Sequence, residues 1–487
     1  MAEDKVTAVK RALVLNPFVY HGENPNVSVD PVIRRHAGQE IKTGLTYPIG
    51  LGYIAAVLLD AGQEVRLLDP IAQPVSVDAI RRDAEWSDAI FIPYTSPHST
   101  HMAEFFSEFR HKLRVTMGAI AENLYEDLLN RDFADVILIG EPEETVAELA
   151  AQYPDLSDIR GIAYRTGGGE VVRNPPRPLI EDLDAVPFPY RGFGNQRGYW
   201  DIPFFGQPTA CVLPARGCPF GCIYCAQWQG YQRTYRKRSP ANVVDEIERV
   251  VAEQGIRCIN FHDPTFNVDA DFNRALCEEI IRRGLDIEWF CSARADLVEE
   301  DVLRLMKRSG CIEVQYGVES ADDAILNQLG RGTTIDRIRE GIDITRKVGI
   351  PFSLYCIFGS RLETAETVEK TMRFVREVKP LFVSFNVLTP LPGSRLFIDV
   401  KDKLDLDQDM QNFDILHTDY VLGEFSAKEL TAIVRRAYRS YYLSIRFACM
   451  LLRKCIEKPK LFYWMMKSVP RQALYLCKSV FLRGEKA

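Results

Sequence analysis

Short apolar segments alternate with amphipathic helical segments in two separate runs of this chain. The first run covers about residues 10–155 and the second about 208–400. A strand, a helix and a second strand in succession favour a βαβ unit, whose two strands lie parallel in one sheet. The length of 487 residues agrees with two such sheets, because it exceeds what one hydrophobic core usually accommodates. We therefore expect an α/β protein of two or three domains.

The first run predicts a doubly wound, Rossmann-like parallel sheet over residues 1–158. Its expected strands are short and apolar: 11–17, 64–70, 89–96, 114–118 and 135–140. Residues 159–176 are typical of a hairpin that turns on three consecutive glycines, and a proline-rich stretch follows. We expect the hairpin and this stretch, residues 159–207, to connect the two domains.

The second run predicts a partial, TIM-like (β/α)6 barrel over residues 208–400. Six strands are expected, each followed by a helical pattern: 209–215, 257–262, 287–293, 313–319, 351–359 and 382–388. In barrels of this kind the chemistry lies at the carboxyl ends of the strands. Residues 401–487 show no such alternation, and we expect a helical, basic region there.

Three cysteines follow the first strand of this expected barrel. Cys218, Cys222 and Cys225 have the spacing C-x3-C-x2-C, whereas no cysteine precedes Cys211. Clustered thiolates bind zinc, cuprous copper or iron–sulfur clusters. Zinc would need a fourth ligand, and no further Cys or His has a paired metal-binding spacing. A 4Fe–4S cluster on three cysteines leaves one iron open for a substrate or cofactor. A zinc-binding module without enzymatic activity is the alternative.

The triplet, with Tyr224 before its last cysteine, resembles the motif of the radical S-adenosylmethionine (radical SAM) family. The resemblance implies that the three cysteines hold a 4Fe–4S cluster whose open iron binds S-adenosylmethionine (SAM). In that family an electron from the reduced cluster cleaves SAM, and the resulting 5′-deoxyadenosyl radical abstracts a hydrogen atom. An electron donor such as flavodoxin or ferredoxin is implied as a partner.

Segments after the later strands extend this resemblance. "NFHDPTFNVD", "CSARADL", "YGVES" and "IFGSRLET" are similar to family segments that contact SAM. The resemblance assigns SAM binding to Tyr224, Asp263, Thr265, Ser292, Arg294, Glu319 and Gly359. The structural alternatives are helix capping for Asp263 and Thr265 and simple ion pairing for Arg294 and Glu319.

The first run resembles the branch of the family that carries a cobalamin-binding domain. "TYPIGLGYIAAVLLDAGQEVRLLD" and "DVILIGEPEETVAEL" are similar to recurring segments of that branch. The resemblance implies bound cobalamin, with Thr95, Ser96, Gly118 and Glu141 as candidate contacts. The sequence lacks the Asp-x-His-x-x-Gly motif that supplies a histidine ligand to cobalt, and "VTMGAIAENL" stands where relatives have Gly-Gly-x-His. A domain that keeps the fold without the cofactor is therefore the alternative.

The resemblance to this family implies a reaction class. We expect a cobalamin-dependent methyltransferase that acts on an unactivated carbon of a small-molecule, lipidic or tetrapyrrole substrate, with methylcobalamin as methyl source. A radical SAM cyclase, or an enzyme that forms carbon–carbon bonds without methyl transfer, is the alternative. Relatives that methylthiolate tRNA or protein carry a second cysteine triplet in the N-terminal domain, which this sequence does not have.

The last 61 residues are basic, in contrast to the rest of the chain. Residues 427–487 contain 14 Lys and Arg against 3 Asp and Glu, although the whole chain has a net charge of −7. Two interpretations remain: an amphipathic helix on anionic lipid, or a helical cap packed on the barrel. We expect no nucleic-acid partner, because no RNA-binding signature accompanies the charge. With no secretory signal and no long apolar stretch, we expect a cytoplasmic protein, with or without peripheral membrane contact.

Overall fold

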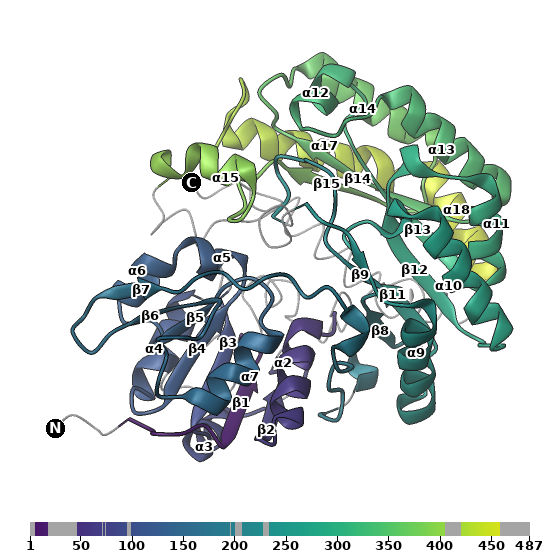
Figure 1. Ribbon diagram of the computed structural model, residues 1–487. Helices are drawn as coiled ribbons and strands as arrows, with labels where there is room; N and C mark the ends of the chain where they lie inside the picture. Colours follow the sequence, from purple (N-terminus) through teal and green to yellow (C-terminus); the bar gives the residue numbers. More distant parts are fainter. Residues whose placement is uncertain are drawn as a thin grey trace. The chain divides into compact units, whose positions relative to one another are not determined.

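The computed structural model describes residues 5–17, 46–70, 72–73, 75–94, 99–194, 196–199, 207–226, 233–404 and 420–457. The protein is α/β and divides into two compact units. The first contains residues 47–198 together with the N-terminal strand, and the second contains nearly all described residues from Tyr199 onward. Each unit is built around one main sheet, which is wholly parallel in the second unit and parallel over five of its seven strands in the first (Figure 1).

The first unit contains a seven-stranded sheet of order β2-β1-β3-β4-β5-β6-β7. Its strands are β1 (Arg11–Leu15), β2 (Glu64–Leu68), β3 (Ala89–Pro93), β4 (Leu113–Met117), β5 (Val136–Leu138), β6 (Ile162–Arg165) and β7 (Val171–Arg173). The first five are parallel, which confirms all five expected strands. The hairpin β6–β7 also forms, but it pairs antiparallel with β5 and extends the sheet instead of lying in a separate connection. It thereby covers the edge that β5 would otherwise expose.

Helices cover both faces of this sheet. They are α2 (Ile49–Asp60), α3 (Val77–Trp86), α4 (Ser99–Glu108), α5 (Ala119–Asn123), α6 (Tyr125–Asn130) and α7 (Glu143–Gln152). One buried cluster joins Leu13 and Leu15 of β1 to α3, α4 and α6. Neighbouring residues of a strand point to opposite faces, so the buried Ala12 and Val14 face the other side, where α2 contacts β1 and packs against α7.

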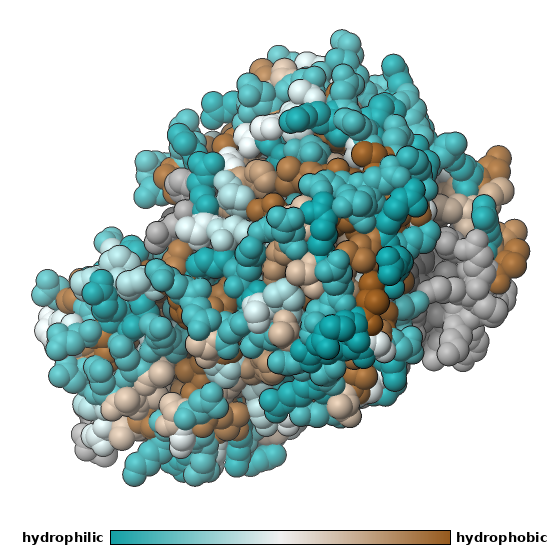
Figure 2. All heavy atoms as spheres, turned by 45° about the vertical axis from the view of Figure 1, so that its right-hand side comes forward, coloured by the Kyte–Doolittle hydropathy of each residue, from teal (hydrophilic) through white to brown (hydrophobic). Residues whose placement is uncertain are grey.

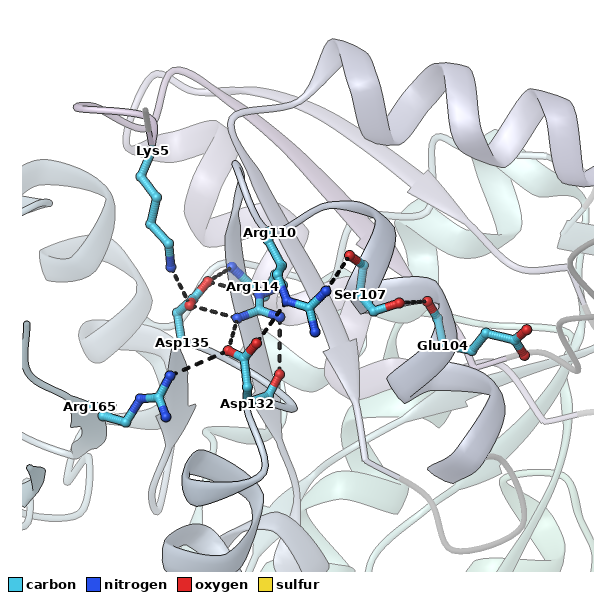
Figure 3. Close-up of polar contacts among 8 residues, drawn as sticks. All are labelled: Lys5, Glu104, Ser107, Arg110, Arg114, Asp132, Asp135 and Arg165. Carbon is cyan, nitrogen blue, oxygen red and sulfur yellow. Dashed lines mark hydrogen bonds and ion pairs between the residues drawn. The ribbon is translucent and has the colours of Figure 1, made fainter. Parts of the chain in front are cut away.

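A buried arginine stabilises the end of the first sheet at which β4 begins. The Arg114 side chain is 1% exposed, and its Nη2 lies 2.7 Å from Asp132 Oδ1 and 2.9 Å from Asp135 Oδ1 (Figure 3). Burial alone would raise the pKa of both carboxyl groups. Arg114 keeps the pKa of Asp135 below its ordinary value, and Arg110 together with Arg114 does the same for Asp132. Because ligands bind at the opposite, carboxyl edge of such sheets, this network is structural.

The second unit contains a six-stranded parallel sheet of order β15-β14-β13-β12-β11-β8. Its strands are β8 (Thr209–Val212), β11 (Cys258–Phe261), β12 (Glu288–Ala293), β13 (Cys311–Glu319), β14 (Phe352–Phe358) and β15 (Val383–Val387). All six expected strands are confirmed, and they run in sequence order across the sheet. β8 and β15 are the edge strands, so the described sheet is open.

Helices follow these strands and pack along one face of the sheet (Figure 1). They are α9 (Pro240–Gln254), α10 (Ala270–Arg282), α11 (Glu300–Arg308), α12 (Asp323–Gln328), α13 (Ile335–Val348) and α14 (Ala365–Val378). Both ends of α9 are capped: the Ser239 hydroxyl accepts a hydrogen bond from Asn242 N at 3.2 Å, and Gly255 ends the helix at φ +64°. The carboxyl ends of the strands therefore all lie at one edge of the sheet.

The C-terminal helix α17 (Ala427–Tyr442) packs on the edge strand β15. It buries Leu430 and Val434 in the core of the second unit. Tyr442 Oη donates to Val383 O at 2.8 Å and accepts from Val383 N at 3.1 Å, so one hydroxyl satisfies both edge-facing backbone groups of that residue. The interpretation of the tail as a cap is thus confirmed for α17. Residues 458–487, the last part of the region expected to be helical and basic, lie outside the described residues.

The face drawn in Figure 2 is mainly hydrophilic, with separate hydrophobic patches. Among the residues described, no helix is long and apolar enough to cross a membrane.

Candidate active site

The cysteine loop begins where β8 ends and is closed at its base by a short antiparallel ribbon. β9 (Ala215–Arg216) pairs with β10 (Arg236–Lys237), so the segment between them forms a loop at the carboxyl edge of the sheet. Arg238 anchors this base: its side chain donates to Leu213 O at 3.3 Å and to Glu246 Oε2 at 2.5 Å. All three cysteines of the triplet lie on this loop.

The cysteine loop covers a cavity of about 210 Å³ at the carboxyl ends of the strands. Its lining combines thiols, aromatic rings and charged groups: Cys218, Phe220, Cys222, Tyr224, Cys225, Pro264, Thr265, Ser292, Ala293, Arg294, Gln315, Gly317, Glu319, Arg331 and Tyr355. Five of the seven residues expected to contact SAM therefore meet the three cysteines around one space.

The three thiols differ in their surroundings: Cys222 is buried, whereas Cys218 and Cys225 are partly exposed. Cys222 is buried and accepts a hydrogen bond from Arg331 Nη1 at 3.7 Å, whereas Cys218 Sγ lies 3.6 Å from Thr265 Oγ1. Within the described part of the chain, no three His, Cys, Asp or Glu side chains converge as ligands of a single metal ion. A 4Fe–4S cluster does not require such convergence, since each thiolate binds a different iron. The donor set of three thiols facing one cavity fits such a cluster.

Backbone contacts fix the centre of the triplet. Ile223, between Cys222 and Cys225, donates through its N–H to Leu329 O at 3.1 Å and accepts from Leu396 N at 2.8 Å. Gly330 lies so close to the backbone of Gly221 that a Cβ on Gly330 would be 2.6 Å from Gly221 O. The φ of Gly330, +71°, also favours glycine at this position. The position of the thiols therefore depends on a turn more than 100 residues further along the chain.

Glu319 ends β13 in a strained conformation. Its φ is +64°, and a register shift separates it from Gly317 in the pairing with β14. Strain of this kind persists where surrounding contacts impose it, most often at functional sites. Tyr224 Oη donates to Glu319 Oε1 at 2.9 Å, and Arg331 Nη1 lies 3.8 Å from the same oxygen. Burial raises the pKa of Glu319, and the neighbouring Arg331 partly opposes the rise.

Arg294 and Ser292 extend the polar wall from the end of β12. Arg294 is 3% exposed, pairs with Asp296 at 2.8 Å and donates to Arg331 O at 2.7 Å. Its guanidinium lies 4.0 Å from the centre of the Phe220 ring, and Nη1 has no hydrogen-bond partner among the described groups. A buried N–H without a partner is costly, which favours an acceptor from a bound ligand at this position.

Two of the expected SAM contacts do not line the cavity. Asp263 is buried below the cysteine loop, where its Oδ1 accepts from Ala215 N at 3.2 Å, and burial raises its pKa well above the ordinary value. Gly359 (φ +100°) is packed against Leu430 of α17 and donates its N–H to Glu363 Oε2 at 3.3 Å. In the structure Asp263 thus binds the backbone of Ala215, and the Gly359 N–H is bound by the side chain of Glu363.

The expected cobalamin contacts lie in the first unit. Gly118 ends β4 at φ +108°, and a Cβ there would meet nothing closer than Tyr94 O at 3.7 Å, so the backbone is open to a ligand. Glu141 is buried, and its Oε2 accepts from Ile180 N at 2.8 Å, which ties it to the segment after the hairpin. Thr95 and Ser96 lie outside the described residues.

Sequence reasoning missed seven residues of the cavity, and four of them have large or polar side chains: Phe220, Gln315, Arg331 and Tyr355. Gln315 could have been found, because inward-facing residues of β13 alternate from Glu319 through Gly317 to Gln315. Tyr355 Oη donates to Gln315 Oε1 at 3.0 Å, and Gln315 Nε2 points to Glu313 Oε2 at 3.5 Å. Arg331 lies in a turn between α12 and α13, where no periodic pattern identifies it.

Comparison with known proteins agrees with the resemblance noted in the sequence. The model of the radical SAM superfamily matches residues 212–375. An uncharacterized methyltransferase of Pyrococcus horikoshii is 28% identical over 407 residues, which cover 81% of this chain and 88% of that protein. The anaerobic magnesium-protoporphyrin IX monomethyl ester cyclase of Rubrivivax gelatinosus is 28% identical over 428 residues, or 85% of this chain and 76% of that protein.

A solved structure extends the similarity to both units. The radical S-adenosylmethionine methyltransferase TsrM of Kitasatospora setae, solved with cobalamin and a 4Fe–4S cluster bound, has a TM-score of 0.64 at 19% identity. The match covers 81% of this chain and 78% of that one. At this identity the match shows a shared fold. Residues 212–375 therefore form a radical SAM domain, and the chain is a radical SAM enzyme.

Proposed function

We propose that this enzyme is a cobalamin-dependent radical SAM methyltransferase acting on an unactivated carbon of a small-molecule or lipidic substrate. One observation carries the proposal: the three cysteines of the triplet face one cavity together with Tyr224, Arg294 and Glu319. The radical SAM domain implies a 4Fe–4S cluster and SAM as cofactors. In this proposal Cys218, Cys222 and Cys225 hold the cluster, which supplies the electron that cleaves SAM.

The charged residues of the cavity suit the methionyl end of SAM. That end carries an ammonium and a carboxylate, and the cavity offers the carboxylate of Glu319 beside the guanidinium groups of Arg294 and Arg331. We assign the ammonium to Glu319 and the carboxylate to the unpartnered Nη1 of Arg294. Ser292 and Thr265 line the same space as neutral hydrogen-bonding groups.

Cobalamin is assigned to the first unit, as a doubly wound, cobalamin-binding-type domain. Its parallel strands have the order 2-1-3-4-5, and sheets of this order bind ligands beyond the carboxyl ends of the strands. Gly118 and Gly140 follow β4 and β5 at this edge with positive φ, and an added Cβ would find open space at Gly140 and only ordinary contact at Gly118. Such backbone fits the close approach of an extended cofactor tail. Cobalamin would supply the methyl group.

A second candidate function is ring closure without methyl transfer. It is favoured by the 28% identity to a magnesium-protoporphyrin monomethyl ester cyclase, which equals the identity to the methyltransferase relative. Both functions use the same cluster and the same SAM cleavage. They differ in whether a methyl group reaches the product, so the cobalt content and the product mass distinguish them.

The test is cofactor analysis after anaerobic purification from cells supplied with iron, sulfide and hydroxocobalamin. We expect about four irons and one cobalt per chain. Iron without cobalt would contradict the methyltransferase assignment and favour the cyclase. Zinc without iron would contradict both and favour a metal-binding module. An electron donor such as flavodoxin or ferredoxin is proposed as the physiological reductant, and dithionite can replace it in the assay.

A further inference from the structure

Helix α18 (Ile445–Glu457) presents an apolar stripe to solvent. Ile445, Leu452 and Ile456 are 85%, 60% and 74% exposed, and they recur at intervals of seven and four residues, which places them on one helical face. Cys449, also exposed, lies between them on that face. Isolated exposed apolar residues are common, but a continuous stripe of them marks an interaction surface.

The opposite face of α18 packs against the second unit, and this packing keeps the apolar stripe facing the solvent. The Phe447 ring lies 4.8 Å from the ring of Tyr442 and 5.7 Å from that of Tyr441, measured between centroids. The Arg446 guanidinium donates to Arg376 O at 2.7 Å, which joins the start of α18 to the end of α14. The helix is therefore held against the second unit with its apolar stripe outward.

A cavity of about 290 Å³ lies where the ends of α14, α17 and α18 meet. Its lining is apolar in part, through Pro380, Tyr441, Phe447 and Met450, and cationic in part, through Arg376, Lys379 and Arg446. Arg376 is paired with Glu369, but Lys379 and Arg446 have no carboxylate partner among the described residues. A pocket with apolar walls and uncompensated positive charge fits an amphiphilic anion.

We propose that α18 and this cavity form a docking surface for an anionic phospholipid membrane. The stripe would enter the boundary between headgroups and acyl chains, and the cationic groups would bind lipid phosphates. The 30 residues after Glu457 contain 7 Lys and Arg against 1 Glu, which adds to the positive charge. A second copy of the chain fits this docking surface less well, because a two-fold contact would place the same cations of both copies opposite each other, where they repel.

The experiment is co-sedimentation of the full chain with vesicles of phosphatidylcholine alone or mixed with phosphatidylglycerol. We expect binding to the mixed vesicles only. Leu452→Asp should weaken that binding by about tenfold or more, because it removes apolar contact and adds a negative charge. Lys379→Gln should weaken it about fivefold through the loss of one cation. Leu59→Asp is the matched control, since Leu59 is a 38% exposed leucine on α2, and it should bind like the wild type.

Three outcomes would overturn the proposal. The first is equal binding to both kinds of vesicle or to neither. The second is binding that neither Leu452→Asp nor Lys379→Gln reduces, which would place the contact elsewhere on the chain. The third is a dimer in solution that Leu452→Asp dissociates, which would make the stripe a contact between copies. SAM cleavage by each variant, measured in parallel, shows that the second unit has folded. The vesicle assay does not depend on the proposed methyl transfer.

Discussion

Arg331 links the cysteine loop to the end of β13. Its Nη1 donates to Cys222 Sγ at 3.7 Å, its Nη2 donates to Gly317 O at 2.5 Å, and Glu319 lies 3.8 Å away. The residue is 7% exposed, so its charge acts through a medium that screens it weakly. A positive hydrogen-bond donor beside a cluster ligand stabilises the reduced, more negative cluster.

Arg331→Met should therefore lower the reduction potential of the reconstituted cluster, because the side chain keeps its length and loses its charge. The measurement is a potentiometric titration followed by electron paramagnetic resonance. Arg233→Met is the matched control: Arg233 lies on the same loop but is exposed, and it donates to Pro219 O at 3.5 Å. An unchanged potential in Arg331→Met would show that Arg331 does not act on the cluster.

Glu313 gives a prediction for stability. It is fully buried on β13, accepts hydrogen bonds from Ser353 and Gln315, and has its pKa raised by burial to about 7. Below pH 4.5, the pKa of this carboxyl in the unfolded chain, Glu313 is protonated in both states and the folded state keeps this stability in full. As pH rises from 4.5 through 7, the unfolded chain loses the proton more readily than the folded chain, so this part of the stability is lost. A shift of this size corresponds to about 3 kcal/mol.

Glu313→Gln should therefore gain stability relative to the wild type as pH rises from 5 to about 8. The measurement is the midpoint of urea unfolding of the two chains across this pH range, and the difference between them isolates Glu313 from other titrating groups. A difference that stays constant with pH would mean that Glu313 ionises as freely in the folded chain as in the unfolded one.

At the scale of elements, the turn at residues 329–332 controls the position of the cysteine loop. Gly330→Ala would place a Cβ 2.6 Å from Gly221 O, so the loop must move. Gly332→Ala is the matched control, because its φ of +61° imposes the same backbone strain while its Cβ would meet nothing within 4 Å. We expect Gly332→Ala to lose about 1 kcal/mol of stability and to keep its iron.

Gly330→Ala should take up clearly less iron than Gly332→Ala after anaerobic reconstitution. Iron per chain is the measurement. Equal iron in the two variants would show that the cluster site tolerates displacement of the loop, and that close approach at Gly330 is unnecessary.

The order of elements was predictable from sequence, but several contacts between them were not. Every expected parallel strand is present, because strand and helix patterns are local and alternate regularly. The pairing of β6 with β5 depends on which edge of the sheet is free to accept another strand, and a local sequence pattern does not indicate this. Arg331 reaches Cys222 across 109 positions of the chain, and its turn has no periodicity to mark it. Asp263 and Gly359 match family motifs in sequence, yet their contacts in the structure are with neighbouring backbone and side chains.

At the scale of the whole molecule, the first unit depends on a buried charge network. Arg114→Ala would leave the carboxylate of Asp135 without its main cation and would remove one of the cations that pair with Asp132, at a cost of about 3 kcal/mol. Arg110→Ala is the control, because Arg110 is 58% exposed and contacts only Asp132 of that pair, so it should cost about 1 kcal/mol or less. Urea unfolding at neutral pH measures both. Equal losses would contradict the structural role of Arg114.

The central claim is that the cysteine triplet holds the cluster that cleaves SAM. The most direct measurement is 5′-deoxyadenosine formed from SAM by the anaerobically reconstituted chain with dithionite, for the wild type, Cys222→Ser and Cys449→Ser. Cys222 lines the cavity, whereas Cys449 is an exposed cysteine on α18. We predict that the wild type and Cys449→Ser form 5′-deoxyadenosine and that Cys222→Ser forms none. Product from Cys222→Ser at the wild-type rate would contradict the claim.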